Sequence, residues 1–204
     1  MSSGSHEGSR LSLWRAVAKE LGAEMDYTDD RHASGRSEII NMRVPHKHWC
    51  IDFQCEGKRS SDGKAEGRSR VRCPIVNPRH FRFHLYEEKL QDRFRKIVGL
   101  QDILIGDTDL DRRFIIQANS EAHIQELMSA ESVRKAFDNP HIEHLRIIDD
   151  ELNNPEPLPA HMDYLYGATQ DRMSNRAEII AHFELFSATL EELLKLGHIE
   201  PDQE

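Results

Sequence analysis

Three aspartates at alternate positions, Asp107, Asp109 and Asp111, have the spacing in this chain most typical of a site for chemistry. Alternate carboxylates form the first half of a calcium-binding loop, in which oxygen ligands converge on a hard cation. The rest of that loop is missing, because Arg112 stands in place of the turn glycine and Ala118 in place of the closing glutamate. The segment therefore favours an acidic turn whose aspartates accept hydrogen bonds from backbone amides. A metal-dependent hydrolase that uses these aspartates is the least favoured alternative.

Arginines on one expected strand are the second group of interest. Arg68, Arg70 and Arg72 alternate and would project from the same face, and Arg82 on a later strand extends that face. Guanidinium forks suit phosphate and carboxylate groups, so this face predicts binding of an anionic ligand such as a phospholipid headgroup or nucleic acid. The alternatives are a solvated face or one covered by acidic residues of the second half, and the face lacks the exposed aromatics that single-stranded nucleic acid prefers.

Other residues that could do chemistry do not form known motifs. The chain has 12 histidines, and His80 and His84 would share the polar face of Arg82, yet no zinc-ligand spacing is present and we expect solvated side chains. Cys50 and His48 lie two apart on a strand, about 7 Å, which is too far for a thiol–imidazole pair. Nucleophile elbows, Walker A loops and dinucleotide fingerprints are absent from the sequence. We therefore expect no catalytic residue and no cofactor.

Composition sets the class of protein. The 204 residues suffice to bury a substantial core, and no apolar run approaches the roughly 20 residues that span a bilayer. Three cysteines without a CxxC pair favour reduced thiols, with Cys55 and Cys73 facing the core, and we expect a cytoplasmic protein. The net charge of −9 is uneven: residues 31–100 carry 16 Lys and Arg against 8 Asp and Glu, whereas residues 101–204 carry 8 against 22.

The elements that must position these residues follow from periodicity. A helix is predicted at 11–21, and alternating apolar residues predict strands at 39–44, 49–55, 71–75 and 81–85. Residues 27–36 and the glycine-punctuated segment 57–67 are expected to be loops, the second a mobile hairpin loop. A helix at 87–98, a strand at 112–118, a helix from 120 to 137 bent near Ser129, strands at 142–149 and 162–168, and a long helix capped by Ser174 complete the second half.

This order predicts an α+β fold with an antiparallel sheet of about four strands followed by a β-α-β-β-α half, as one compact domain or two intimately packed halves. We divide the chain into a disordered lead-in at 1–10, a basic sheet half at 11–98, an acidic half at 99–197 that ends in the long helix, and a tail at 198–204.

The order of short motifs resembles an uncharacterised family of bacterial proteins, a domain of unknown function. The matching pieces are a strand led by Trp49, the pair Arg70-x-Arg72, Gly-x-Gln-Asp-Ile at 99–103, Gly106-Asp107, Asp-x-x-Phe at 111–114 and a leucine-rich helix at 183–194. The resemblance covers most of residues 11–197. Asp109 falls in the variable gap of this pattern, and Leu110 stands where a phenylalanine is usual. The resemblance implies no activity, cofactor or catalytic residue.

Taken together, these features predict a non-catalytic binding or interaction module. We expect a protein partner, because the two halves differ in charge and no catalytic group is evident. Binding of an anionic ligand by Arg68, Arg70, Arg72 and Arg82 is the alternative. The sequence leaves the oligomeric state open.

Overall fold

The computed structural model describes residues 4–32, 35–89, 100–139, 141–148, 158–159, 161–169 and 171–201. In these ranges nine strands form one sheet in the order β1-β2-β3-β4-β9-β8-β5-β7-β6, and all neighbouring pairs are antiparallel. The strands are β1 (Glu24–His32), β2 (Gly35–His46), β3 (Trp49–Ser60), β4 (Ala65–Val76), β5 (Phe83–Glu87), β6 (Gln101–Asp102), β7 (Phe114–Ala118), β8 (His144–Ile148) and β9 (Met162–Thr169). The α+β class and the antiparallel sheet are confirmed, but the expected size of about four strands is wrong.

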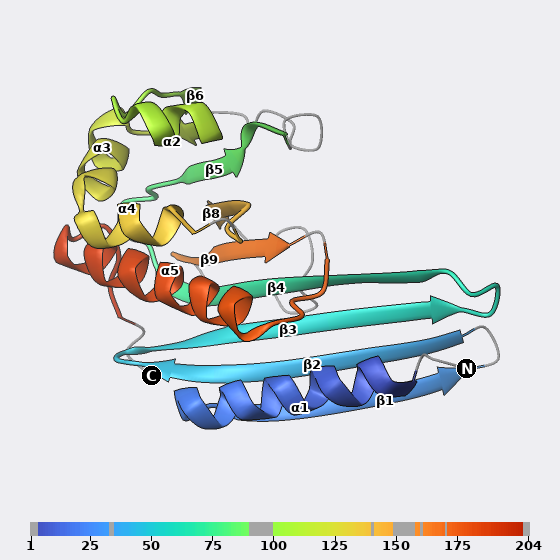
Figure 1. The fold of residues 1–204 in the computed structure, drawn as a ribbon. Coiled ribbons are helices and arrows are strands. Elements are labelled where there is room, and N and C mark those ends of the chain that lie inside the picture. The colour runs from blue at the N-terminus through green and yellow to red at the C-terminus, as the bar shows by residue number, and fades with distance from the viewer. Residues whose placement is uncertain are drawn as a thin grey trace.

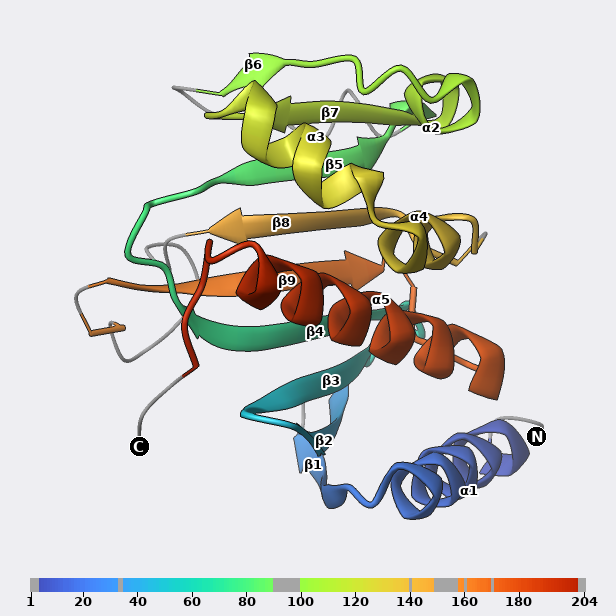
Figure 2. The same ribbon diagram turned by 90° about the vertical axis from the view of Figure 1, so that its left-hand side faces the viewer.

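The helices form a second layer. They are α1 (Gly4–Leu21), α2 (Thr108–Arg113), α3 (Glu121–Ser129), α4 (Glu131–Phe137) and α5 (Arg176–Lys195). Figures 1 and 2 show α1, α3, α4 and α5 along one face of the sheet. Trp14 of α1 packs edge-on against Phe53 of β3 with ring centroids 6.4 Å apart. At the other end of the sheet, Phe137 of α4 packs in the same way against Phe114 of β7 at 5.3 Å. The core therefore lies between the helical layer and this single face.

Alternation along the central strands matches the sequence. Ile51, Phe53 and Cys55 of β3 are buried under the helices, whereas Asp52 and Gln54 lie on the opposite face. Cys73 of β4 is buried as well, so the expectation of two core-facing thiols is confirmed. The described chain contains only free cysteines.

Local signals explain most helix ends. The Ser120 side chain accepts a hydrogen bond from the amide of His123 and caps α3, and the chain bends at Ala130, as predicted, before α4 begins. The long helix α5 is capped by Asn175 instead of the expected Ser174, because the Asn175 side chain accepts from the amide of Glu178. Gly197 follows α5 with a φ of 69°, the left-handed conformation that favours glycine.

The main corrections concern polar segments. Residues 27–36 were expected to form a loop, but residues 27–32 belong to β1 and residues 35–36 to the start of β2, and the two strands pair from Glu24 to His32. The expected loop 57–67 is mostly strand, since β3 continues to Ser60 and β4 begins at Ala65. Cross-strand backbone hydrogen bonds hold these polar strands, so they carry little hydrophobic alternation for sequence to reveal.

The two expected halves share one sheet. Strands β9 and β8, from the second half, lie between β4 and β5 of the first half. Helix α1 begins at Gly4, inside the expected disordered lead-in. Ile199 of the expected tail is buried, and the amide of Glu200 donates to the carbonyl of Val76 at 2.9 Å.

The helix predicted at 87–98 falls largely outside the described residues. Among the helices that the structure describes, none combines the length and the hydropathy needed to cross a membrane.

Candidate arginine pocket

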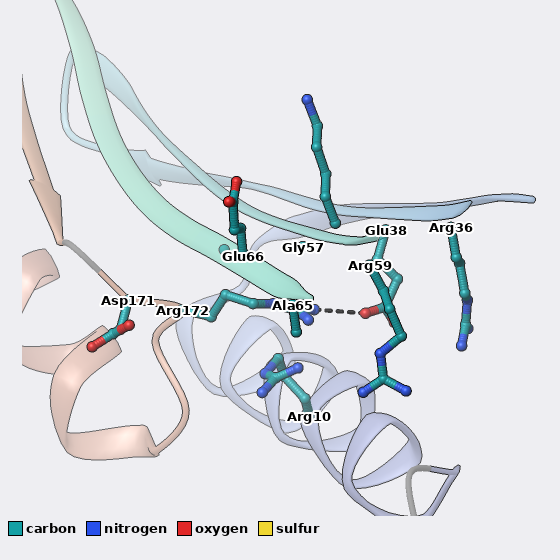
Figure 3. A pocket seen from close by; sticks show the side chains of 11 residues that line it. Arg10, Arg36, Glu38, Gly57, Arg59, Ala65, Glu66, Asp171 and Arg172 are labelled. Atoms are coloured by element: carbon teal, nitrogen blue, oxygen red, sulfur yellow. Dashed lines mark hydrogen bonds and ion pairs between the residues drawn. The ribbon is translucent and has the colours of Figure 1, made fainter. Parts of the chain in front are cut away.

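Strands β2, β3 and β4 extend beyond α5 at one end of the sheet (Figure 1). A cavity of about 380 Å³ lies there, and Figure 3 shows the side chains that line it. Strand β9 pairs with β4 only from Ser69 onward, so the three long strands continue as a ribbon without β9 beside them. The cavity is lined by α1, by this ribbon and by the connection between β9 and α5. The lining residues are Arg10, Arg36, Glu38, Gly57, Lys58, Arg59, Ala65, Glu66, Gly67, Asp171 and Arg172.

Strand register places the lining in two rows. Glu38, Gly57 and Gly67 lie directly beside one another on β2, β3 and β4. In the next row on the same face, Arg36 lies beside Arg59. Residues between these rows point to the other face, because side chains alternate along a strand.

The two glycines make room for Arg172. A Cβ atom at Gly57 would lie 2.3 Å from Nη1 of Arg172, and one at Gly67 would lie 2.4 Å from its Cγ and Cδ. Arg172 therefore lies across a part of the ribbon that has no side chains. Its Nη2 atom donates to Oε2 of Glu38 at 2.7 Å, and the Tyr27 hydroxyl donates to Oε1 of the same carboxylate at 3.1 Å.

Two arginines of the pocket are thus held by carboxylates. Glu38 is only 6% exposed, so it is largely desolvated where it meets Arg172. Burial opposes the charge on Arg172, but hydrogen bonds to Cys55 and Glu38 outweigh it and raise the pKa of the guanidinium. Arg36 donates to both carboxylate oxygens of Asp29, at 2.6 and 2.9 Å, and this bond lowers the pKa of Asp29.

The other two arginines have no such partner. Within the described ranges, neither Arg10 nor Arg59 has an acidic side chain within ion-pair distance, and Nε of Arg10 is buried without a hydrogen bond. Figure 3 shows the guanidinium groups of these two and of Arg36 and Arg172 on the same side of the ribbon, the side of α1. Glu66 points to the other side of the ribbon. The pocket therefore holds an excess of positive charge.

The arginine face predicted from sequence lies on the opposite side of the same ribbon. Arg68 and Arg70 of β4 both bind Glu56 of β3, Arg68 through Nε at 3.0 Å, and Nε of Arg70 also donates to Gln54 at 2.6 Å. Partial burial opposes the charge on Glu56, but Arg70 and Arg68 outweigh it and lower the pKa of this carboxyl. Both arginines are therefore bound by one carboxylate of a neighbouring strand, which compensates one of their two positive charges.

The remaining predicted members lie apart from this pair. Arg72 stacks over the ring of Tyr164 on β9, with the guanidinium carbon 5.5 Å from the ring centroid. Arg82 precedes β5, and its Nη2 lies 3.9 Å from Oδ1 of Asp163. The structure thus places Arg68, Arg70 and Arg72 on one face of β4 as predicted. Arg82 lies apart from them, near Asp163.

The three aspartates lie at the start of the short helix α2, and Asp107 caps it. The Asp107 side chain accepts from the amides of Asp109 and Leu110 and begins α2, so the predicted acidic turn is confirmed. Asp111 accepts from the amides of Ile105 and Gly106, at 3.0 and 2.9 Å, and forms no ion pair with an arginine of the described residues. In the described part of the chain, no group of three or more His, Cys, Asp or Glu side chains is arranged to hold a metal ion.

Buried histidines are a further correction. His84 was expected to be solvated, but it is 1% exposed on a central strand, with its ring 4.7 Å from that of Tyr86. Burial, together with the charge of Arg146, lowers the pKa of His84 to about 3. His182 of α5 is equally buried, and burial lowers its pKa to about 4 although Nδ1 contacts the carbonyl of Glu178 at 2.8 Å.

Sequence reasoning missed the pocket because its arginines lie in segments expected to be irregular. Arg10 falls in the expected lead-in, and Arg36 and Arg59 fall in expected loops. The available signal was the spacing of Gly57 and Gly67, which marks two close approaches on paired strands.

No protein family, no curated protein and no solved structure matches this chain. The resemblance to a bacterial family of unknown function therefore stays a prediction, and the function must be argued from the site.

Proposed function

We propose that this chain is a binding module without a catalytic role, and that it holds an anionic ligand in the arginine pocket. The observation that carries the proposal is the pair Arg10 and Arg59, which line the cavity without an acidic partner in the described ranges. Nε of Arg10 is buried without a hydrogen bond, which costs free energy, and an anionic ligand would supply the missing acceptor. Arg59 is exposed, and its positive charge has no ion-pair partner in the described ranges. Arg36 and Arg172, fixed by Asp29 and Glu38, would need little reordering to contribute.

The pocket is favoured over the open sheet face for the same ligand class. On that face Glu56 binds both Arg68 and Arg70, so an anion would compete with an existing carboxylate. In the pocket, Glu38 binds Arg172 and its register neighbour Asp29 binds Arg36, which leaves Arg10 and Arg59 without a carboxylate in the described ranges.

The test compares charge reversals on the two sides of one ribbon. Inorganic phosphate and sulfate are titrated into the wild-type chain, Arg59→Glu and Arg68→Glu at low and at high salt, with binding followed by calorimetry. Arg59→Glu should weaken binding by about tenfold or more, and Arg68→Glu should leave it nearly unchanged. Salt should weaken binding to the wild type. Equal losses in the two variants would move the site to the open face, and no binding of either anion would end the proposal.

A protein partner is the second candidate, supported by β1. This nine-residue strand is one edge of the sheet, and an exposed edge can pair with a strand of another protein. The variant Asp26→Lys with Thr28→Lys would disfavour such pairing, because lysines on an edge oppose strand addition. A partner captured equally well by wild type and variant does not use this edge. A cytoplasmic setting and a bacterial origin also belong to the proposal, and the free thiols support the first.

A further inference from the structure

We infer that the ligand of the arginine pocket is a small molecule that carries a phosphomonoester group. This inference rests on the proposed function, and it names the chemistry that the pocket would select among anions. Charge, direction of approach and size each support it.

The charge of the pocket matches a dianion. Four arginines, Arg10, Arg36, Arg59 and Arg172, line the described pocket on the side of α1. The carboxylates that hold two of them are Asp29 and Glu38. Two positive charges therefore stay uncompensated among these six groups. Of the other acidic lining residues, Glu66 points to the other side of the ribbon, and Asp171 is exposed with its carboxylate turned away from these guanidinium groups in Figure 3. A phosphomonoester carries about −1.5 to −2 at pH 7, whereas a phosphodiester or a single carboxylate carries −1.

The guanidinium groups approach from different elements. Arg10 comes from α1, Arg59 from β3 and Arg172 from the connection between β9 and α5, and Figure 3 shows them entering the same space. A planar carboxylate is satisfied by one bidentate fork in its own plane. A terminal phosphate has three oxygens that point in different directions, so it can accept from donors on several sides at once.

The size of the cavity and the charge of the whole chain favour a small ligand over a polymer. A volume of about 380 Å³ lies at the lower end of the range for small-molecule sites, roughly 300–1,000 Å³. The chain carries a net charge of −9, which repels a long polyanion such as nucleic acid. A compact anion inside the pocket feels mainly the nearby arginines, because salt screens charges beyond about 8 Å.

The experiment compares defined anions on the full chain. The probes are glycerol 3-phosphate, citrate, single-stranded oligothymidylate and vesicles that contain phosphatidic acid, each tested for binding and for competition with inorganic phosphate. We expect glycerol 3-phosphate to bind about tenfold more tightly than citrate, and oligothymidylate and vesicles not to compete. Arg59→Gln and Arg10→Gln should each lose this preference, and Arg68→Gln, on the opposite side of the ribbon, is the matched control.

A pH titration adds a second readout, with folding checked at each pH because acidification should also destabilise the fold through the buried histidines. Arginines stay charged, so affinity for glycerol 3-phosphate should rise between about pH 5 and pH 7 as its second proton leaves, near pH 6. Tighter, Arg59-dependent binding of citrate, oligothymidylate or vesicles, or affinity that does not rise with pH, would overturn the phosphomonoester inference and leave anion binding intact. Absence of any binding that depends on Arg59 would overturn the proposed function itself.

Discussion

The two sides of the β2–β4 ribbon both carry arginines, but the residues that neighbouring strands place near these arginines differ between the two sides. On the open side, Glu56 stands beside Arg68 in the strand register and also reaches Arg70, so each guanidinium meets a carboxylate. On the side of α1, Gly57 and Gly67 stand beside Glu38, and the space they leave admits Arg172 from a distant segment.

This difference shows that the number of arginines on a surface says little about anion binding. Register places the carboxylate of Glu56 beside Arg68, whereas Arg59 has Arg36 and Ala65 as its neighbours, so no carboxylate stands beside Arg59 within the ribbon. The open side is a solvated ion-pair surface by this criterion, and the pocket side is a candidate binding site. The following predictions test that distinction, in order of decreasing effect.

The largest loss of folding stability is expected for Arg172→Gln. This change removes the guanidinium from Glu38, whose side chain is 8% exposed, and leaves a largely buried carboxylate with only the Tyr27 hydroxyl as its observed side-chain donor in the described ranges. Breaking one side of a buried pair costs about 3–5 kcal/mol, to be measured as the free energy of unfolding in urea.

The matched control is Arg70→Gln on the open side. Arg70 and Arg172 have equally exposed side chains, 17% each, but Glu56 would keep Arg68. Arg70→Gln should therefore lower the free energy of unfolding by clearly less than Arg172→Gln does. The double variant Arg172→Gln with Glu38→Gln should recover part of the loss, since no unpaired charge remains. Equal losses for Arg172→Gln and Arg70→Gln would contradict the distinction between the two sides.

An intermediate effect is expected from pH, which acts on the buried histidines and not on the arginines of the ribbon. The folded-state pKa values of His84 and His182, about 3 and about 4, lie below the unfolded value of about 6.5. Their contribution to stability is complete above pH 6.5 and is lost as pH falls, because only the unfolded state then binds the proton. Between about pH 7 and pH 5.5 each histidine should remove roughly 1 kcal/mol from the free energy of unfolding.

Urea unfolding at these two pH values checks the prediction. His182→Gln should reduce the pH dependence, whereas Arg59→Gln in the pocket should leave its slope unchanged, because arginine does not titrate in this range. Stability that stays constant on acidification would show that the histidines are not buried as described.

The smallest effect is expected for Arg68→Gln on the open side. The Arg68 side chain is 55% exposed, and exposed ion pairs contribute less than about 1 kcal/mol. Glu56 would still meet Arg70. Thermal unfolding should therefore shift little, and the shift should shrink further at high salt. A loss as large as that of Arg172→Gln would show that the open side is not a simple surface pair.

Elements with apolar periodicity were predictable from the sequence. The hairpin of β2 and β3, the bend between α3 and α4 and the long helix α5 were all predicted, because each buries an alternating or helical stripe of apolar side chains. The capping role of Asp107 was predictable too, since it depends only on residues that follow within the next turn.

Polar strands and long-range pairs were not predictable in the same way. Strand β1 and the outer part of the ribbon have polar side chains, so the pairing of their backbones left no apolar pattern to read. The size of the sheet was missed because β4 pairs with β9, 86 to 100 residues later, and joins the two expected halves.

The sequence by itself determined the class of the fold, the core-facing side of each apolar strand and the acidic cap of α2, because these depend on local spacing. Only the tertiary structure decided which arginines line a common pocket. Arg10, Arg36, Arg59 and Arg172 are far apart in the chain, and they meet because α1, the ribbon and the approach to α5 converge over two paired glycines. Whether the positive charge of an arginine is compensated depends on which side chain lies beside it in space. Strand register and helix packing set that neighbouring side chain.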